Sequence, residues 1–417
     1  MTESNFKKSS IKQLLDNIRL LEKKNNCFLH LTANENQMSQ TANSFLSSKL
    51  SERYYFGKGE KGVIDMGFFT ALGLKEIREL IVMAENALKD ALHASIVNIK
   101  CLSGIHNMIN ALLSVSRPGD TIMTIREKDG GHFATKIILE RIGRKQIYAS
   151  YDRQKLNFNI EKTSQDFKKN KAKILYLDAL AFIAPINLKE IRETLGKKAI
   201  VIYDASHTLG LIIGQEFQQP LLEGADIITA NTHKTFPGPQ KGLMAFKNKN
   251  LGEKVISIMD SGLYSSSHTH HLISLAITLL EMKQYGCQYA KQIIANSQSL
   301  GQALCNLGFT IRRTPDGDFS KNHQLHIFID NKKDRIELYR NLVNNYISTN
   351  FIGYPGERLY IRIGIQEVTR RGMKEPEMKK IASFLNRALK GENIKKEILL
   401  FNSKFNKISY SFDHLNV

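Results

Sequence analysis

Long hydrophobic runs are absent from this chain of 417 residues, and their absence excludes several classes of protein. No stretch approaches the ~20 consecutive apolar residues that a membrane-spanning helix needs. The N-terminal segment MTESNFKKSSIKQLL has no apolar core of the signal-peptide type. We therefore expect a cytoplasmic protein with no membrane partner.

Paired cysteines are also missing. The chain has four cysteines, which lie far apart and form neither a Cys-x-x-Cys pair nor a zinc-binding spacing: Cys27, Cys101, Cys287 and Cys305. The segment 268–271, His-Thr-His-His, could bind a metal, but its spacing matches no common zinc pattern. We therefore expect reduced thiols and no bound metal.

Acidic residues are too few to balance the basic ones. The 59 lysines and arginines against 40 acids give a formal net charge of +19. The lysines are scattered rather than aligned in a stripe, and no nucleic-acid-binding motif accompanies them. We therefore expect no nucleic-acid partner, and the excess charge would attract small anions such as phosphates and carboxylates. A non-catalytic basic binding protein is the alternative from a different class.

The apolar patterns that are present indicate two or three domains. Residues 1–31 have the pattern of an amphipathic helix and a short extended piece, and 75–92 and 270–305 are expected to be helices. Strand-like runs alternate with helical patterns from 96 to about 246, as in a parallel α/β sheet. The strands are expected at 96–100, 121–125, 173–178, 199–203, 226–230 and 242–246, with two more near 323–329 and 359–363 in a smaller α+β domain.

Two of the expected strands end at residues that carry chemistry. The run 199–203 leads to Asp204, and the run 226–230 leads to Asn-Thr-His and then Lys234. Ligands of open α/β sheets bind beyond the carboxyl ends of the strands. An acid and an amine at that edge suit pyridoxal phosphate, whose ring nitrogen needs a carboxylate and whose aldehyde needs a lysine. The sequence therefore predicts a pyridoxal-phosphate site on Asp204 and Lys234.

Three further segments fit such a site. Ser103 and Gly104 begin a helical pattern, where free N–H groups favour a phosphate, although serine is also a common helix N-cap. Glycines at 130 and 131 would let the backbone approach closely, and His132 could stack on a flat ring or be a polar surface residue. Arg362 is a charge inside an apolar run, so it needs an anion, either a substrate carboxylate or an internal ion pair.

In this order, the motifs resemble those of serine hydroxymethyltransferase and its relatives among fold-type I pyridoxal-phosphate enzymes, over roughly residues 31–386. The resemblance implies an α/β fold with a mostly parallel, seven-stranded type of sheet. It divides the chain into an N-terminal helical arm (1–40), a large cofactor-binding domain (41–270) and a small C-terminal α+β domain (271–417). It also implies a homodimer with shared active sites. The motifs are 31–36 (LTANEN), 103–104 (SG), 117–121 (RPGDT), 130–132 (GGH), 204–207 (DASH), 232–235 (THKT) and 362–364 (RIG).

The same resemblance implies a role for each residue of the site. Lys234 would hold the cofactor as a Schiff base, Asp204 would keep the ring nitrogen protonated, and His132 would stack on the ring. Arg362 would bind the substrate carboxylate, and Asn34 would also help to bind substrate. Glu52 would move protons during catalysis, unless it is only a surface acid. The remaining cofactor-binding residues would be Ser103, Gly104, His207 (at the phenolic oxygen), Thr232 and His233, while His268, His270 and His271 would lie at a subunit interface near the phosphate.

Several departures from the family pattern bear on the reaction. Asn34 replaces a serine that helps to hold substrate, and Ile183 replaces a serine near the phenolic oxygen. The glycine-rich interface loop becomes 265–271, and the segment that helps to form the folate pocket is shortened to 348–356. Some of these departures recur in relatives that carry out aldol or transaldol reactions on threonine-like amino acids without folate.

We therefore expect an enzyme that makes or breaks the Cα–Cβ bond of β-hydroxy-α-amino acids, with an amino acid and an aldehyde as small-molecule partners and without strict need of tetrahydrofolate. The alternatives on this scaffold are a folate-dependent serine hydroxymethyltransferase and an aminotransferase or decarboxylase. Residues 57–62 (GKGEKG) also spell the dinucleotide-binding pattern G-x-G-x-x-G, but no helical pattern follows them, so we expect no dinucleotide.

Overall fold

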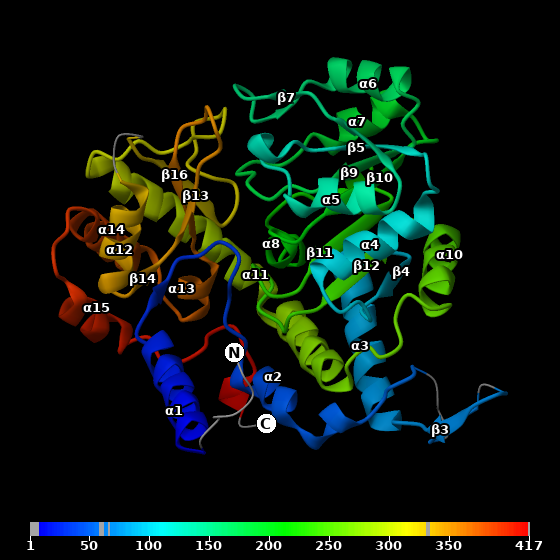
Figure 1. The fold of residues 1–417 in the computed structure, drawn as a ribbon, viewed down its shortest axis with the longest axis horizontal. Helices are drawn as coiled ribbons and strands as arrows, with labels where there is room; N and C mark the ends of the chain where they lie inside the picture. Colours follow the sequence, from blue (N-terminus) through cyan, green and yellow to red (C-terminus); the bar gives the residue numbers. More distant parts are fainter. Residues whose placement is uncertain (1–7, 58–61, 66, 331–333, 416–417) are drawn as a thin grey trace.

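The structure is a computed structural model that describes residues 8–57, 62–65, 67–330 and 334–415. The chain forms a larger and a smaller part, and the long helix α11 (Thr269–Asn306) runs between them (Figure 1). Most of the G-x-G-x-x-G segment, residues 58–61, lies outside the described residues. None of the helices in the described ranges has the length and apolar character needed to cross a membrane.

A seven-stranded sheet forms the centre of the larger part, in the order β4-β12-β11-β10-β9-β5-β6. Only β12 runs in the direction opposite to the other six strands, which confirms the mostly parallel sheet expected from the sequence. The edge strand β6 was not expected, because its sequence, Lys-Gln-Ile-Tyr, is short and half polar. The strands are β4 (Ile96–Asn98), β5 (Thr121–Thr124), β6 (Lys145–Tyr148), β9 (Ile174–Leu177), β10 (Ile200–Asp204), β11 (Ile227–Asn231) and β12 (Gly242–Phe246).

Both faces of this sheet are buried, which is why its strands are unbroken apolar runs. On β9, Leu175 and Leu177 belong to one apolar core and Ile174 and Tyr176 to another, because successive side chains point to opposite faces. The first core is completed by α3 (Lys75–Leu92), α6 (Ile160–Lys169), α7 (Leu188–Leu195), α8 (Leu209–Ile213), α9 (Pro220–Glu223) and α11, and the second by α4 (Gly104–Val115), α5 (Ala134–Arg141) and α10 (Lys249–Asp260).

A third core lies in the smaller part, beside the antiparallel sheet β13-β16-β15. Leu300 and Leu304 of α11 belong to it, and so do Leu29 and Leu31 from the N-terminal region. Helix α11 thus contributes side chains to the apolar cores of both parts. The domain limits at 40 and 270 stay predictions. The elements are β1 (Leu29–His30), β13 (Gln324–Phe328), α12 (Arg335–Asn344), β14 (Ile347–Ser348), β15 (Asn350–Ile352), β16 (Tyr360–Gly364), α13 (Gln366–Arg370), α14 (Glu375–Leu389) and α15 (Lys395–Asn402).

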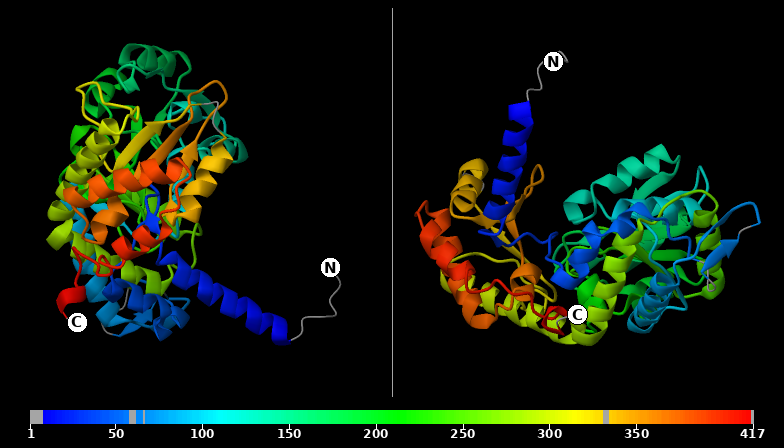
Figure 2. Two further views of the ribbon diagram at one scale, coloured as in Figure 1. Left: turned by 90° about the vertical axis from the view of Figure 1, so that its left-hand side faces the viewer. Right: turned by 90° about the horizontal axis from the view of Figure 1, so that it is seen from below.

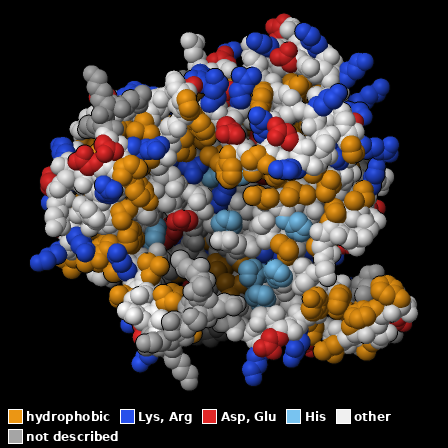
Figure 3. Space-filling view, in the orientation of Figure 1, with side chains coloured by type: hydrophobic (Ala, Val, Ile, Leu, Met, Phe, Trp, Pro, Cys, Tyr) orange, Lys and Arg blue, Asp and Glu red, His pale blue; other side chains and the backbone are white. Residues whose placement is uncertain are grey.

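Helix α1 (Lys8–Asn25) projects from the rest of the molecule (Figure 2). Its apolar side chains are between 46% and 64% exposed, among them Leu14 and Ile18. A hairpin of β2 (Val63–Asp65) and β3 (Thr70–Leu72) also exposes apolar side chains, with Phe68 at 90% (Figure 3). The remaining short elements are α2 (Gln40–Ser44), β7 (Tyr151–Asp152) and β8 (Asn157–Phe158).

Candidate active site

The carboxyl ends of the parallel strands meet at one edge of the large sheet, where a cavity of about 280 Å³ lies. Segments that follow five different strands supply its wall, and histidine side chains are visible in the hollow between the two parts (Figure 3). The lining residues are Ser103, Gly104, Ile105, Met108, His132, Asp178, Ala179, Leu180, Asp204, Ser206, His207, Asn231, His233 and Lys234. The sheet thus brings together side chains that lie more than a hundred residues apart in the chain.

Lys234 follows β11 and is 9% exposed. Its Nζ lies 3.1 Å from His207 Nε2, and the Asn231 amide oxygen, in the orientation that satisfies both amide groups, accepts from Nζ at 3.2 Å. Burial lowers the pKa of Lys234 from 10.5 to about 8, although the nearby Asp204 carboxylate opposes this change. A lowered pKa increases the share of neutral amine, which is the nucleophilic form.

Asp204 ends β10, and three donors fix its carboxylate. Oδ2 accepts from the Tyr176 hydroxyl at 2.9 Å and from the Thr229 hydroxyl at 3.2 Å. Oδ1 accepts from the backbone N–H of Ser206 at 2.9 Å. The carboxylate is therefore held at the cavity wall in one orientation, where it can bind a protonated ring nitrogen.

The start of α4 forms the wall that suits an anion. Ser103 is the N-cap, and its Oγ accepts from the backbone N–H of His106 at 3.1 Å. Ser103, Gly104 and Ile105 all line the cavity, so the first turn brings unpaired N–H groups and the positive end of the helix dipole to it. A Cβ on Gly104 would lie 3.1 Å from Asn231 Cβ, so glycine allows the close approach of α4 and β11.

His132 lies in a loop whose course requires glycine. Gly130 has a φ of +98°, and a Cβ on Gly131 would lie 2.4 Å from the backbone oxygen of Ile125. Burial lowers the pKa of His132, so its imidazole is neutral at neutral pH even though Asp204 favours the charged form. The imidazole lines the cavity, as stacking on a ring would require.

Asp178, at the end of β9, anchors this loop. Its Oδ2 accepts from the backbone N–H of His132 at 3.2 Å and from the Thr135 hydroxyl at 2.5 Å, and its Oδ1 accepts from the N–H of Ile125 at 3.3 Å. Burial raises the pKa of Asp178 to about 7. Our sequence analysis missed this residue, although it follows an apolar strand just as Asp204 does, and that position was the available signal.

Two more histidines surround the lysine. Burial, and then the charge of Lys234, lowers the pKa of His207 well below its usual value and that of His233 to about 4. The Nδ1 atoms of both imidazoles are buried and have no hydrogen-bond partner among the described residues. His323, which the sequence analysis also missed, stacks on His207 with ring centroids 5.8 Å apart and binds the carbonyl oxygen of Ala33.

Arg362 reaches the site from β16 of the smaller part. It is 6% exposed, and its Nη2 donates to the amide oxygens of Asn34 at 3.3 Å and Asn350 at 3.2 Å. In the described part of the chain it forms no ion pair, and its buried Nε has no partner. The guanidinium charge therefore lacks a counter-ion, as expected of an arginine that waits for a substrate carboxylate.

Four predicted site residues are absent from the cavity lining: Arg362 and Asn34, which bind each other beside it, and Glu52 and Thr232. Glu52 is exposed, and its Oε2 lies 3.9 Å from Arg53 Nη1. The buried Thr232 hydroxyl donates to the carbonyl oxygen of Pro239 at 2.5 Å and accepts from the N–H of Lys241. The catalytic role of Glu52 and the cofactor contact of Thr232 stay predictions.

The residues that are present fit pyridoxal phosphate. A buried amine, an oriented carboxylate, the imidazole of His132 and a helix N-terminus surround one small cavity, and such groups match the parts of the cofactor. The two imidazole nitrogens without a protein partner are an independent sign that a polar ligand belongs here, because buried polar atoms are normally hydrogen-bonded.

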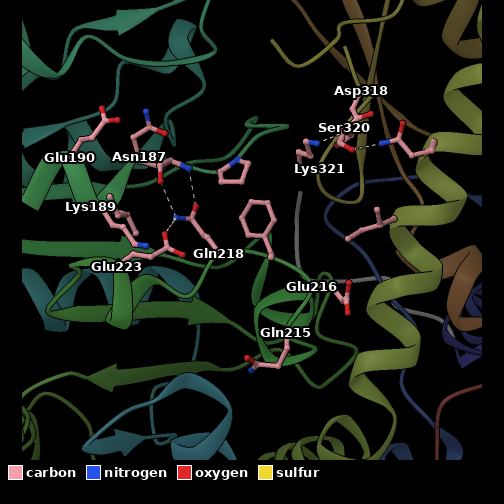
Figure 4. Close-up of a pocket in the computed structure, with 16 residues that line it drawn as sticks. Asn187, Lys189, Glu190, Gln215, Glu216, Gln218, Glu223, Asp318, Ser320 and Lys321 are labelled. Carbon is pink, nitrogen blue, oxygen red and sulfur yellow. Dashed lines mark hydrogen bonds and ion pairs between the residues drawn. The ribbon is translucent and has the colours of Figure 1, made fainter. Parts of the chain in front are cut away.

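A larger cavity of about 790 Å³ lies between α7 and the smaller part (Figure 4). Its polar side chains already bind one another: Gln218 donates to Glu223 at 2.8 Å and accepts from the N–H of Ile186, and Lys321 pairs with Asp318. This crevice therefore offers little to a ligand. The histidines at 268, 270 and 271 lie close together, yet no group of His, Cys, Asp and Glu within the described ranges is arranged to hold a metal.

Comparisons with known proteins agree with this geometry. The serine hydroxymethyltransferase family model matches residues 8–385. A serine hydroxymethyltransferase of Methanocella arvoryzae is 35% identical over 92% of both chains. A fluorothreonine transaldolase of Streptantibioticus cattleyicolor is 35% identical over 86% of this chain and 56% of its own length. The crystal structure of an L-threonine transaldolase from Pseudomonas fluorescens superposes with a TM-score of 0.89 and 27% identity, covering 98% of this chain and 95% of that one.

Proposed function

The chain belongs to the serine hydroxymethyltransferase family of pyridoxal-phosphate enzymes, and from this membership we propose a folate-independent activity on β-hydroxy-α-amino acids. Like its relatives, it acts on the Cα–Cβ bond of hydroxy amino acids. The proposal adds that the amino acid is of the glycine/serine or threonine type, and that an aldehyde rather than a folate is released and taken up. The observation that carries the amino-acid part of this proposal is the buried Arg362 beside the Lys234–Asp204 cavity, which has no counter-ion among the described residues.

The chemistry divides between the cofactor and the protein. When bound, pyridoxal phosphate supplies an electron sink for negative charge at Cα of an amino acid. Arg362 and Asn34 bind the substrate carboxylate and so orient the Cα bonds. Asp204, fixed by its three donors, holds the proton at the ring nitrogen. The neutral imidazole of His207, with Nε2 3.1 Å from Nζ, can accept a hydrogen bond from Lys234 and so orient the amine.

The proposal of folate independence rests on the small part. The residues at 348–356, which would contribute to a folate pocket, form only the end of β14, the short strand β15 and a turn. Two proteins that resemble this chain over most of its length are named as transaldolases acting on threonine-type amino acids. Strict folate dependence, as in serine hydroxymethyltransferase itself, is the competing function.

A second copy of the chain is part of the proposal. Glu52 lies at the surface and away from its own cavity, so it can serve catalysis only if it reaches the cavity of another subunit. The exposed apolar side chains of α1 and of the β2–β3 hairpin would be buried by such a partner. We place this homodimer in the cytoplasm, since its four cysteines are free.

The test is to incubate the protein and pyridoxal phosphate with L-serine, L-threonine and longer β-hydroxy amino acids, with and without tetrahydrofolate. We expect glycine and aldehyde to appear without folate, as measured by chromatography. Arg362→Ala should raise KM by about 30-fold or more while cofactor binding changes little, because only the substrate carboxylate loses its charged partner. Strict folate dependence would establish the competing function, and release of carbon dioxide or of pyridoxamine phosphate would overturn both.

A further inference from the structure

A second cavity, of about 460 Å³, adjoins the candidate active site. Gly130 lines this cavity, whereas His132, in the same loop, lines the active site. Likewise Ala181 lines the second cavity and the preceding residue, Leu180, lines the first. Because consecutive Cα atoms are only about 3.8 Å apart, the two cavities are immediate neighbours.

Strand β16 of the smaller part connects the two cavities through Tyr360 and Arg362. Tyr360, which lines the second cavity, and Arg362 are two residues apart on β16, so their side chains share one face of the small sheet. Burial raises the pKa of Tyr360, and the charges of Arg312 and Arg362 lower it, so both arginines lie close to this ring. A molecule whose reacting end lies near Arg362 can therefore extend into the second cavity.

This second cavity is rich in unpaired positive charge. Lys128, Arg312 and Arg358 line it, and within the described ranges none of their side chains makes a hydrogen bond or an ion pair. The Arg312 guanidinium lies 5.2 Å from the ring centroid of Phe328 and 5.3 Å from that of Tyr360. A guanidinium stacked on rings keeps its in-plane N–H donors free, and these donors match a carboxylate or a phosphate.

The acids beside this cavity are already engaged. Arg153 binds both oxygens of Glu357, at 2.5 and 2.6 Å, and its Nη2 lies 3.3 Å from Asp129. These contacts connect the β7–β8 turn to the smaller part and to the His132 loop. Neither carboxylate lies within ion-pair distance of Lys128, Arg312 or Arg358, although Arg153, and then the charges of Lys128 and Arg312, lower the pKa of Glu357. Lys and Arg side chains lie at the upper end of the hollow, with a few acidic side chains among them (Figure 3).

We propose that this cavity, which we call the arginine pocket, binds the distal anionic end of the aldehyde substrate. The preferred aldehydes then carry a carboxylate or phosphate on a flat ring, with the ring against Phe328 and Tyr360 and the anion on Arg312 and its neighbours. A cavity of about 460 Å³ suits a ring with one such group. This inference rests on the proposed function, because it assigns the second substrate of the same reaction.

The test compares aldehydes that differ only in charge. With L-threonine as amino-acid donor, benzaldehyde, 4-formylbenzoate and 4-formylphenyl phosphate are each offered as acceptor, and kcat/KM for the new β-hydroxy amino acid is measured by chromatography. We expect the anionic aldehydes to be preferred by about tenfold or more, with the two anions distinguishing carboxylate from phosphate recognition. Arg312→Met should abolish most of this preference, whereas the matched control Arg335→Met, at an exposed position of α12, should keep it.

The preference is a ratio measured within one preparation, so partial misfolding of a variant cannot change it. A second measurement needs no variant: phenyl phosphate should compete with the anionic aldehydes, and less so as salt rises from about 50 to about 500 mM. Equal use of all three aldehydes, or a preference that survives Arg312→Met, overturns the arginine pocket but leaves the proposed function intact. Failure to cleave any β-hydroxy amino acid overturns the proposed function instead. If tetrahydrofolate competes with the anionic aldehydes and, with L-serine as donor, accepts the one-carbon unit, the pocket holds a folate tail and our proposal is wrong.

Discussion

Buried ionisable side chains meet the cost of desolvation in different ways at this site. Lys234 is stabilised as a neutral amine, which is the form that reacts. Asp178 accepts three hydrogen bonds and has a pKa of about 7. Arg362 cannot lose its proton at any ordinary pH, so its charge is compensated only by neutral oxygens until an anion binds. Each of these side chains is therefore suited to one chemical task.

The lowered pKa of Lys234 leads to a prediction about cofactor uptake. We expect the rate at which the cofactor-free protein binds pyridoxal phosphate covalently to rise with pH and to level off above about pH 8. Below about pH 8 most of the Lys234 amine is protonated and cannot attack the aldehyde, and above that pH most of it is already neutral. Stopped-flow absorbance of the bound cofactor measures the rate. A rate that still rises steeply near pH 10 would indicate an ordinary lysine with a pKa of 10.5.

Element packing at the junction of the two parts depends on one buried ion pair. Arg370 of α13 and Glu281 of α11 are both fully buried, and Arg370 Nη2 lies 2.9 Å from Glu281 Oε2. Glu281 Oε1 also accepts from the backbone N–H of Phe412 at 2.9 Å, and Arg370 donates to the carbonyl oxygen of Tyr410. The pair thus holds α11, α13 and the C-terminal segment together.

We predict that Glu281→Gln lowers the free energy of unfolding by about 3–5 kcal/mol, because it leaves the Arg370 charge buried without a partner. Denaturant unfolding followed by circular dichroism measures the loss, since the chain has no tryptophan. The control is Glu253→Gln, which breaks an exposed ion pair with Lys249 on α10 and should cost less than about 1 kcal/mol. Similar losses in the two variants would mean that the buried ion pair contributes no more to the free energy of unfolding than an exposed one.

The whole molecule exposes apolar surface that its own fold does not cover. Ile11, Leu14, Leu15, Ile18 and Leu21 form one stripe along α1, a helix that projects from the body (Figure 2). Isolated helices of this length are marginally stable in water. A second subunit would cover this stripe, and it would also give Glu52 a cavity to act on.

We predict that Leu14→Glu with Ile18→Glu converts the proposed dimer into monomers and removes most of the activity, because the charges enter the proposed interface. Analytical ultracentrifugation and the cleavage assay measure the two effects. Gln13→Glu with Asn17→Glu adds the same charge to α1 outside this stripe and should leave both unchanged. A wild-type protein that is an active monomer would refute the shared site.

The sequence alone determined the sheet and most of its chemistry. Runs such as 199–203 become buried parallel strands because their apolar side chains must leave water on both faces. Residues at the ends of such strands must then meet at one edge, which is how Asp204 and Lys234 could be paired in advance. The half-polar edge strand β6 lacked this pattern and was missed.

Only the tertiary structure decided which side chains from the two parts face one another. His323 stacks on His207, and Arg362 reaches Asn34, because α11 and the N-terminal strand fix the smaller part against the larger one. The arginine pocket arises in the same way, since Lys128 and Arg312 come from opposite sides of the junction. No local pattern encodes such contacts, because they depend on the packing of whole elements rather than on the period of any one of them.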